Sequence, residues 1–322
     1  MEKWYKRLLA GLGVGIASSI PGVSGGTIMV ILKVSEGIIW ATSHLFTEFK
    51  KAIKYLLPIL LGAFAAAVPM IFVMDYALKG FLFGAVCIFA GFIIGSIPSI
   101  TDEVKGVKVK PIYIVISIIA FIIALGVAIA TVFAKTDVSP YFESPKWWFY
   151  FIVIAVGLVS SAALVVPGIS GGMLLILLGF YKPLMTSTAD ILKQALHGDF
   201  SRFWTQLGLL GCFAIGIGIG FLIITAVMNI LLKKYRTGVF YGILGFVIGS
   251  AAALFYNFEI YQYYEFWGTG SYIFMPMAVE LPVGIVLLIA TCIVSYLLVR
   301  MQRKELNKKE EKVEISSTSV EE

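Results

Sequence analysis

Two short serine–glycine segments hold the residues best suited to binding chemistry in this chain. The first is Pro21-Gly22-Val23-Ser24-Gly25-Gly26-Thr27 and the second is Pro167-Gly168-Ile169-Ser170-Gly171-Gly172-Met173. Proline and paired glycines end a helix, and glycine allows a ligand to approach the backbone closely. A helix that begins at such a turn presents unpaired N–H groups at the positive end of its dipole, which favours phosphate. The predicted phosphate-binding residues are Ser24, Gly25, Gly26, Thr27, Ser170, Gly171 and Gly172. The same turns would also suit a tight helix crossing or a plain kink.

Four charged residues could assist an anion site. Lys33 and Glu36 follow the first segment, Lys182 follows the second, and Arg202 lies further along the chain. Charged side chains are expensive inside a bilayer, so their presence there usually has a function. Lys33 or Lys182 could offset the charge of a phosphate, Glu36 could carry a coupling proton, and Arg202 could attract a lipid phosphate. Side chains that reach the interface with only their charged ends would explain the same residues equally well.

The sequence contains no arrangement typical of catalysis or metal binding. Its two histidines, His44 and His197, have no nearby metal ligands or nucleophile, and its three cysteines lie within apolar segments. A membrane lipid phosphatase would need a histidine acting with arginines beside a phosphate pocket, and the Ser-Gly-Gly turns have no base near them in the sequence. Two further acids, Asp75 and Glu280, fall at the ends of apolar segments, where we expect them to be solvated. We therefore predict no enzyme activity, no metal and no cofactor.

The composition is that of an integral membrane protein. Of 322 residues, 59% are hydrophobic and only 14% are charged, and the mean hydropathy is +0.94. Soluble domains carry about a quarter charged residues. Six apolar stretches each approach or exceed the roughly 20 residues that a membrane-spanning helix needs. These predicted helices are 55–77, 81–100, 111–134, 207–232, 238–256 and 281–299. The net charge of +6 belongs to the segments between them and does not indicate nucleic-acid binding.

The chain is a tandem of two similar halves. Ser170 follows Ser24 by 146 residues, and the segment Gly245–Ser250 repeats Gly91–Ser96 at an offset of 154. Several matches in the same order favour duplication. We predict a repeat one over 1–140 and a repeat two over 141–302, each with a motif segment, an amphipathic stretch and three transmembrane helices. The motif segments are 8–32 and 147–180, the amphipathic stretches are 37–54 and 183–204, and a disordered tail is expected over 303–322.

The distribution of basic residues predicts the topology. If both motif segments are re-entrant hairpins and the N-terminus is cytoplasmic, 19 of the 25 Lys and Arg residues lie inside. If both segments cross fully, only 15 do, so the positive-inside rule favours the re-entrant arrangement. Three crossings per half are an odd number, and the second half therefore enters from the opposite face. The predicted fold class is an all-α polytopic membrane protein of two inverted repeats, whose two glycine breaks meet near the bilayer midplane.

These segments together resemble the polyprenyl-phosphate transporter family, long catalogued as a domain of unknown function with the number 368. The resemblance is carried by the segments 21–27 and 167–172, by Glu36 and by Gly179-Phe180-Tyr181, and it covers about residues 5–300. It implies a bacterial plasma-membrane protein that returns undecaprenyl phosphate, the carrier lipid of wall synthesis, to the cytoplasmic leaflet. Both termini would be cytoplasmic, and the seven residues of the two turns would hold the phosphate headgroup. Lys33 departs from the family pattern, where we expect glycine.

Moving a phosphate toward a negative interior is opposed by the membrane potential, so we expect proton coupling with Glu36 as its first candidate. The expected partners are a polyprenyl phosphate and the bilayer, without nucleic acid, and the oligomeric state, including a homo-oligomer, stays open. Two alternatives remain at this point. One is a transporter or channel for a small soluble anion, which would use the same turns without lateral access to lipid. The other is a lipid-phosphate enzyme.

Overall fold

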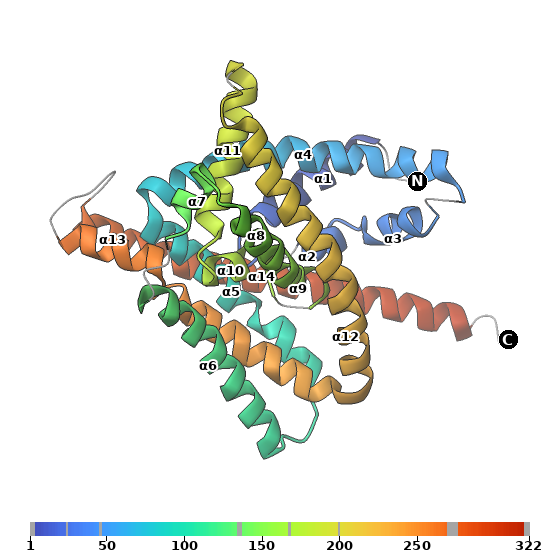
Figure 1. The fold of residues 1–322 in the computed structure, drawn as a ribbon. Helices are drawn as coiled ribbons and strands as arrows, with labels where there is room; N and C mark the ends of the chain where they lie inside the picture. The colour runs from blue at the N-terminus through green and yellow to red at the C-terminus, as the bar shows by residue number, and fades with distance from the viewer. Residues whose placement is uncertain are drawn as a thin grey trace.

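The computed structural model describes residues 4–23, 25–44, 47–133, 137–166, 169–198, 200–268 and 276–318. All regular structure in these ranges is helical (Figure 1). The helices are α1 (Trp4–Ser19), α2 (Gly25–Ile31), α3 (Ser35–Ser43), α4 (Phe49–Gly80), α5 (Leu82–Thr101), η1 (Asp102–Val104), α6 (Pro111–Phe133), α7 (Ser139–Glu143), α8 (Trp147–Ser160), α9 (Ala162–Val165), α10 (Gly171–Leu177), α11 (Tyr181–His197), α12 (Phe203–Ala253), α13 (Phe258–Gly268) and α14 (Met277–Thr318).

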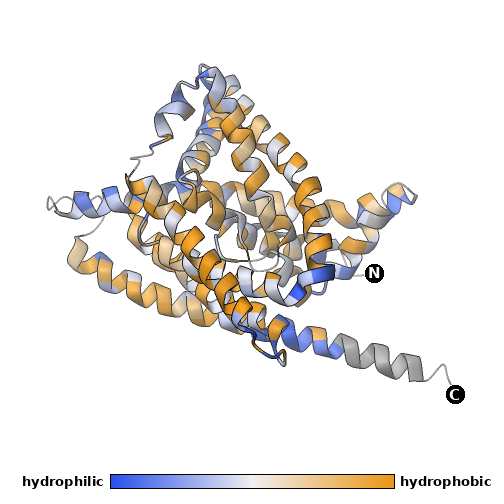
Figure 2. Ribbon diagram, turned by 60° about the horizontal axis from the view of Figure 1, so that its bottom comes forward, coloured by the Kyte–Doolittle hydropathy of each residue, from blue (hydrophilic) through white to orange (hydrophobic). Residues whose placement is uncertain are grey.

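Six of these helical segments are long and apolar enough to cross a membrane, and up to eight are if each of two bent helix pairs counts as one span. The α6 helix shows why, because its 23 residues include no charged side chain. Hydrophobic residues cover most of the long helices, and hydrophilic residues gather at helix ends and connections (Figure 2). Within the bilayer a helix satisfies its own backbone hydrogen bonds, which makes this architecture the stable one. The protein is a multi-pass helical membrane protein, as the composition predicted.

A kink at Tyr235, whose φ of −135° and ψ of 34° are not helical, divides α12 between the predicted helices 207–232 and 238–256. The second of these ends at Ala253 in the structure, three residues before its predicted end. In addition, the segment Trp147–Leu164, which the sequence placed in a re-entrant hairpin, is itself long enough to be a candidate span. The predicted boundary at residue 140 between the two repeats falls in α7.

The last helix continues beyond the expected end of the folded chain. Helix α14 runs to Thr318, whereas the sequence predicts a disordered tail from Arg303 onward. Two ion pairs anchor α14 where its apolar run ends, one between Arg303 and Asp102 and one between Glu305 and Lys33. Six of the seven residues 308–314 are Lys or Glu, which are strong helix formers. Local propensity and these anchors therefore extend the helix past the apolar run.

Equivalent helices of the two halves pair in the same way. Helix α1 packs along α4, and α8 packs along α12. A Cβ added at Gly62 would overlap the carbonyl oxygen of Leu8, and a Cβ added at Gly216 would overlap that of Ile154. The two glycines are 154 residues apart and the two carbonyls 146 apart, which are the offsets of the sequence repeat. The repeat therefore extends from sequence to backbone packing.

A second set of pairings joins the two halves to each other. Helix α5 packs along α14, and α6 packs along α12 (Figure 1). A Cβ at Gly95 would overlap the carbonyl oxygen of Cys292, and at Gly249 it would come within 2.9 Å of Phe121 Cα, so both crossings are tight. In each pair, one helix of the first half lies against one helix of the second. Two long helices of each half thus pack against the other half. Helix α2 contacts α1 and α14, and helix α10 contacts α6, α8 and α12, so each glycine break lies between the two halves.

Candidate functional site

Each glycine motif opens a short helix that ends in a sharp bend. Helix α2 meets α3 at 111°, and α10 meets α11 at 113°. In both, the backbone reverses through a left-handed residue, Lys33 with φ 60° and Gly179 with φ 74°. The N–H of Val34 donates to Met29 O at 3.0 Å, and the N–H of the equivalent residue, Phe180, donates to Leu175 O at 2.8 Å. This bond pattern is the Schellman ending of a helix, which satisfies carbonyls that would otherwise be unpaired.

The two motifs line one cavity of about 1420 Å³. From the first motif the lining includes Gly25, Gly26 and Thr27, and from the second it includes Ser170, Gly171 and Gly172. They also touch each other, because a Cβ at Gly172 would lie 2.7 Å from Cγ of the buried Pro21. Ser24 lies outside the described residues, as do Pro167 and Gly168. The structure thus brings together the six described members of the predicted phosphate site.

Most of the polar side chains that line this cavity carry hydroxyl groups. Several already donate to helix carbonyls, but Ser18, Ser160 and Ser170 make no hydrogen bond to any described residue. Ser160 is only 6% exposed, so its unpaired hydroxyl is a buried donor without a partner. Burying a polar group without a hydrogen bond is unfavourable, and such groups indicate a missing ligand or water. The polar lining residues are Ser18, Ser19, Thr27, Ser96, Ser99, Glu103, Ser160, Ser161, Ser170, Tyr181, Ser295 and Gln302.

The cavity also reaches an apolar outer surface. Its lining includes Leu60, Leu61 and Phe64 on α4 and Leu164 on α9, all of them exposed. Phe64 is 70% exposed and Leu164 is 64% exposed. On a membrane-spanning protein, large exposed apolar side chains contact lipid. The cavity therefore has polar turns at its centre and a rim suited to hydrocarbon chains.

Comparison of the sequence with known proteins shows the family of this chain. The undecaprenyl phosphate translocase-like family model matches residues 14–266, which include both motifs and the cavity. The chain belongs to this family. It is 28% identical to the polyprenyl-phosphate transporter of Staphylococcus aureus over 264 residues, which are 79% of this chain and 86% of the relative. It is 24% identical to the polyprenyl-phosphate transporter of Vibrio cholerae over 256 residues, 75% of this chain and 74% of the relative. No solved structure matches. The resemblance found in the sequence is confirmed, and these relatives are named transporters rather than enzymes.

The charged residues singled out by the sequence lie away from the cavity lining of this translocase-like protein. Lys33 pairs with Glu305 at 3.1 Å, and Arg202 lies 3.6 Å from Glu143 at the surface. Glu36 is exposed on α3 and Lys182 lies at the start of α11, and neither borders the cavity. Among the described residues the charged member of the lining is Glu103, which accepts a hydrogen bond from Arg236 at 2.7 Å. Their roles as charge partners or in coupling stay predictions.

Sequence reasoning missed several polar residues of the cavity. Ser18 precedes the first motif and Ser160 precedes the second, each next to another serine in an apolar helix. Paired hydroxyls in an apolar run a few residues before each motif are a signal that could have found them. Gln302 accepts a hydrogen bond from Thr27 at 3.1 Å, although 275 residues separate them. That contact depends on the packing of α14 against α2, which no local pattern encodes.

The expectation that Asp75 and Glu280 are solvated was wrong. Asp75 is 5% exposed and pairs with Lys79, while also accepting a hydrogen bond from Thr186 at 2.7 Å. Glu280 is 0% exposed and accepts a hydrogen bond from the Tyr263 hydroxyl at 2.8 Å. Both lie near helix ends, but α11 covers the first and α13 covers the second. Interfacial helices from elsewhere in the chain therefore bury carboxylates that a linear reading places in water.

Proposed function

We propose that this protein is a translocase that moves undecaprenyl phosphate, or a related polyprenyl phosphate, across the membrane. The observation that carries the proposal is the single cavity lined by both Ser-Gly-Gly turns and bordered by exposed apolar side chains. The headgroup occupies the polar centre, and the polyprenyl tail stays in lipid along the apolar rim. Family membership and the names of both relatives support a polyprenyl phosphate as the substrate.

The turns suit a phosphate because they concentrate donors in one place. In α10 the first intrahelical bond is from Leu174 N–H to Ser170 O, so the N–H groups of Gly171 and Gly172 have no intrahelical partner. The free hydroxyls of Ser160 and Ser170 add two donors beside them. Oriented donors hold an anion without a full positive charge in the bilayer, where burying a charged side chain is costly. Lys33, Lys182 and Arg202 would then act at the approaches to the cavity.

The rim distinguishes a lipid-linked phosphate from a small soluble anion. A soluble anion needs polar access along its whole path, because it has no part that gains from contact with lipid. Phe64, Leu60 and Leu164 instead place hydrocarbon at the border of the cavity. An enzyme acting on the same lipid is disfavoured by the transporter family. Both considerations favour translocation of an intact lipid phosphate.

We further propose that the two halves are inverted repeats in a bacterial plasma membrane, with both termini cytoplasmic. The reciprocal pairing of α5 with α14 and of α6 with α12 supports a pseudo-twofold relation between the halves. The matched bends of 111° and 113° support the same relation at the two motifs. Inverted halves would let one site open alternately toward each leaflet by movement of one half against the other.

The proposed direction is from the outer to the cytoplasmic leaflet, which would return the carrier lipid for the synthesis of cell-wall polymers. A phosphate monoester carries about −1.5 to −2 charges at neutral pH. Moving each charge toward a negative interior costs about 2.3 kcal/mol per 100 mV. We therefore propose that protons accompany the headgroup. Glu36, the first candidate from the sequence, is exposed on α3 outside the cavity lining.

The decisive experiment removes one hydroxyl from each turn. In the double variant Ser24→Ala/Ser170→Ala, we expect loss of polyprenyl-phosphate adducts in native mass spectrometry and loss of translocation in proteoliposomes. The matched control is Thr42→Ala/Thr188→Ala, two equivalent positions 146 residues apart on α3 and α11. Their hydroxyls donate to Ile38 O at 2.8 Å and Leu184 O at 2.7 Å and do not border the cavity. Unchanged lipid binding in the serine variant would overturn the assignment of the headgroup site.

A further inference from the structure

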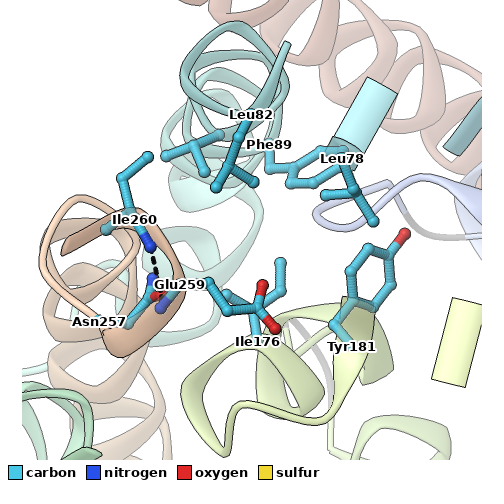
Figure 3. Close-up of a pocket in the computed structure, with 9 residues that line it drawn as sticks. Leu78, Leu82, Phe89, Ile176, Tyr181, Asn257, Glu259 and Ile260 are labelled. Atoms are coloured by element: carbon cyan, nitrogen blue, oxygen red, sulfur yellow. Dashed lines mark hydrogen bonds between the residues drawn. The ribbon is translucent and has the colours of Figure 1, made fainter. Parts of the chain in front are cut away.

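A second, much smaller pocket adjoins the headgroup cavity and contains a carboxylate. It has a volume of about 10 Å³, near the lower limit for one water molecule. Eight of its nine lining residues are uncharged, and the ninth is Glu259 at the start of α13. In Figure 3 the Glu259 carboxylate points into the space between Ile176 and Tyr181. The lining residues are Leu78, Leu82, Val86, Phe89, Ile176, Tyr181, Asn257, Glu259 and Ile260.

A local cap orients Glu259 at the start of α13. Asn257 caps α13, since its Oδ1 accepts the N–H of Glu259 at 3.1 Å and that of Ile260 at 3.3 Å. This cap sets the first turn of the helix and directs the Glu259 side chain toward α10 and α11. The Glu259 carboxylate itself makes no hydrogen bond or ion pair with the described part of the chain. A partly buried carboxylate without a fixed partner is available to bind and release a proton.

Tyr181 forms a wall shared by the small pocket and the headgroup cavity. It lines both, and its ring packs edge-on against Phe89 at a centroid distance of 5.9 Å. Its hydroxyl donates to Ser19 O at 3.3 Å, which ties it to the end of α1 just before the first motif. Glu259 therefore lies across one side chain from the cavity in which the phosphate would bind.

The charged groups that act on Glu259 are few. Lys182 on α11 is the nearby cation and Asp137, just before α7, is the nearby anion. The parts of α4, α5 and α10 that face the pocket contribute only apolar side chains, and Tyr181 is the other titratable residue in the lining. Glu280, which is fully buried, differs because the Tyr263 hydroxyl and the Gly84 N–H already donate to it and it borders neither space.

We propose that Glu259 is the site that binds the proton accompanying the lipid phosphate. This inference rests on the proposed function. In each cycle the Glu259 carboxylate takes up one proton from the side from which the headgroup enters. It releases that proton past Tyr181 on the other side, so that one positive charge crosses with the phosphate and no bond other than O–H changes. Intramembrane carboxylates that face a cavity commonly serve as proton relays.

The test measures translocation of a short-chain polyprenyl phosphate in proteoliposomes with and without an imposed pH gradient. For the unaltered protein we expect a faster rate with the gradient. For Glu259→Gln we expect the ratio of the two rates to fall to one, because glutamine keeps the shape and cannot exchange a proton. The control is Glu265→Gln, an exposed glutamate on the same helix, which should respond as the unaltered protein does. Lipid adducts in native mass spectrometry should persist in both variants.

The outcomes separate this inference from the function on which it rests. If the unaltered protein neither binds nor moves the lipid, both fail. If the unaltered protein responds to the gradient and Glu259→Gln responds equally, only the role of Glu259 is overturned. Should Glu259→Gln fail to fold, Tyr181→Phe decides, since it keeps the ring against Phe89 and removes the hydroxyl at the shared wall. A response reduced several-fold supports the route past Tyr181, and a full response overturns it.

Discussion

The two glycine breaks have the same geometry and opposite surroundings. Both bend by a little over 110° and both end in the same backbone hydrogen bonds. Yet α2 contains no buried residue, whereas five consecutive residues of α10, Met173 to Leu177, are buried. Polar contacts with α14 join the first break, from Thr27 on α2 to Gln302 and from Lys33, in the turn after α2, to Glu305. Few buried contacts and reliance on polar ones are features of segments that move, so we expect the second break to be the fixed wall of the cavity and the first to be its mobile side.

The largest test of this comparison truncates one equivalent apolar side chain in each break. Leu175 and Met29 are 146 residues apart, and each supplies the carbonyl that accepts the closing bond of its short helix. Leu175 is buried in the main core and Met29 is only partly buried. We expect Leu175→Ala to destabilise the protein by about 2–5 kcal/mol, the usual range for core truncation, and Met29→Ala by less than half as much. Thermal unfolding in detergent measures both. Equal losses would contradict the view that only the second break is a fixed wall.

A smaller effect is expected where the two breaks touch. Gly172→Ala would place a methyl group 2.7 Å from Cγ of Pro21, and that ring is rigid and buried. Overpacking of this kind costs about 1–3 kcal/mol and would push the two motifs apart. Gly171→Ala is the matched control, because its Cβ would lie 3.7 Å from Ala163, an ordinary contact.

The measurement for this pair is unfolding temperature together with lipid binding. We expect Gly172→Ala to lower both and Gly171→Ala to keep the unfolding temperature, since alanine is the better helix former. If Gly172→Ala is as stable as the unaltered protein, the contact between the two halves is loose, and the first break has more freedom than its contacts suggest.

Local patterns in the sequence were enough to predict the membrane helices and the motif pair. The apolar runs predicted α5 and α6 to within one residue at each end, because a span of hydrocarbon limits helix length. Helix α4 begins at Phe49, six residues before its predicted start and within the predicted amphipathic stretch 37–54. The doubled Ser-Gly-Gly turns predicted residues that the structure places around one cavity. Both predictions depend on short-range composition, because an apolar segment in a bilayer must form a helix to satisfy its backbone hydrogen bonds.

What the sequence did not predict depends on contacts between distant segments. The Thr27–Gln302 bond and the burial of Glu280 by Tyr263 each join parts of the chain that have no periodic relation. The position of Glu259 beside the cavity likewise follows from where α13 packs, so it could not be singled out among the acidic residues. The charged residues chosen for their closeness to the motifs in sequence, such as Glu36, lie outside the lining because the 111° bend directs α3 away.

The finest test concerns the left-handed residue of each bend, which is a lysine in the first and a glycine in the second. Lys33 has φ 60° and its equivalent, Gly179, has φ 74°. A side chain in the left-handed region costs about 1–2 kcal/mol, so Gly179→Ala should lower stability by about that amount. Lys33→Gly should relieve a similar strain, but it also removes the exposed pair with Glu305, which is worth about 0–1 kcal/mol.

Making Lys33→Gly in a Glu305→Gln background separates the two effects, because no pair is then left to lose. We expect stabilisation of up to about 1 kcal/mol in that background, since glycine is also more flexible in the unfolded chain. If Lys33→Gly destabilises the protein even there, the lysine is held in its left-handed conformation by contacts other than Glu305, and the first break is more firmly fixed than its exposure indicates.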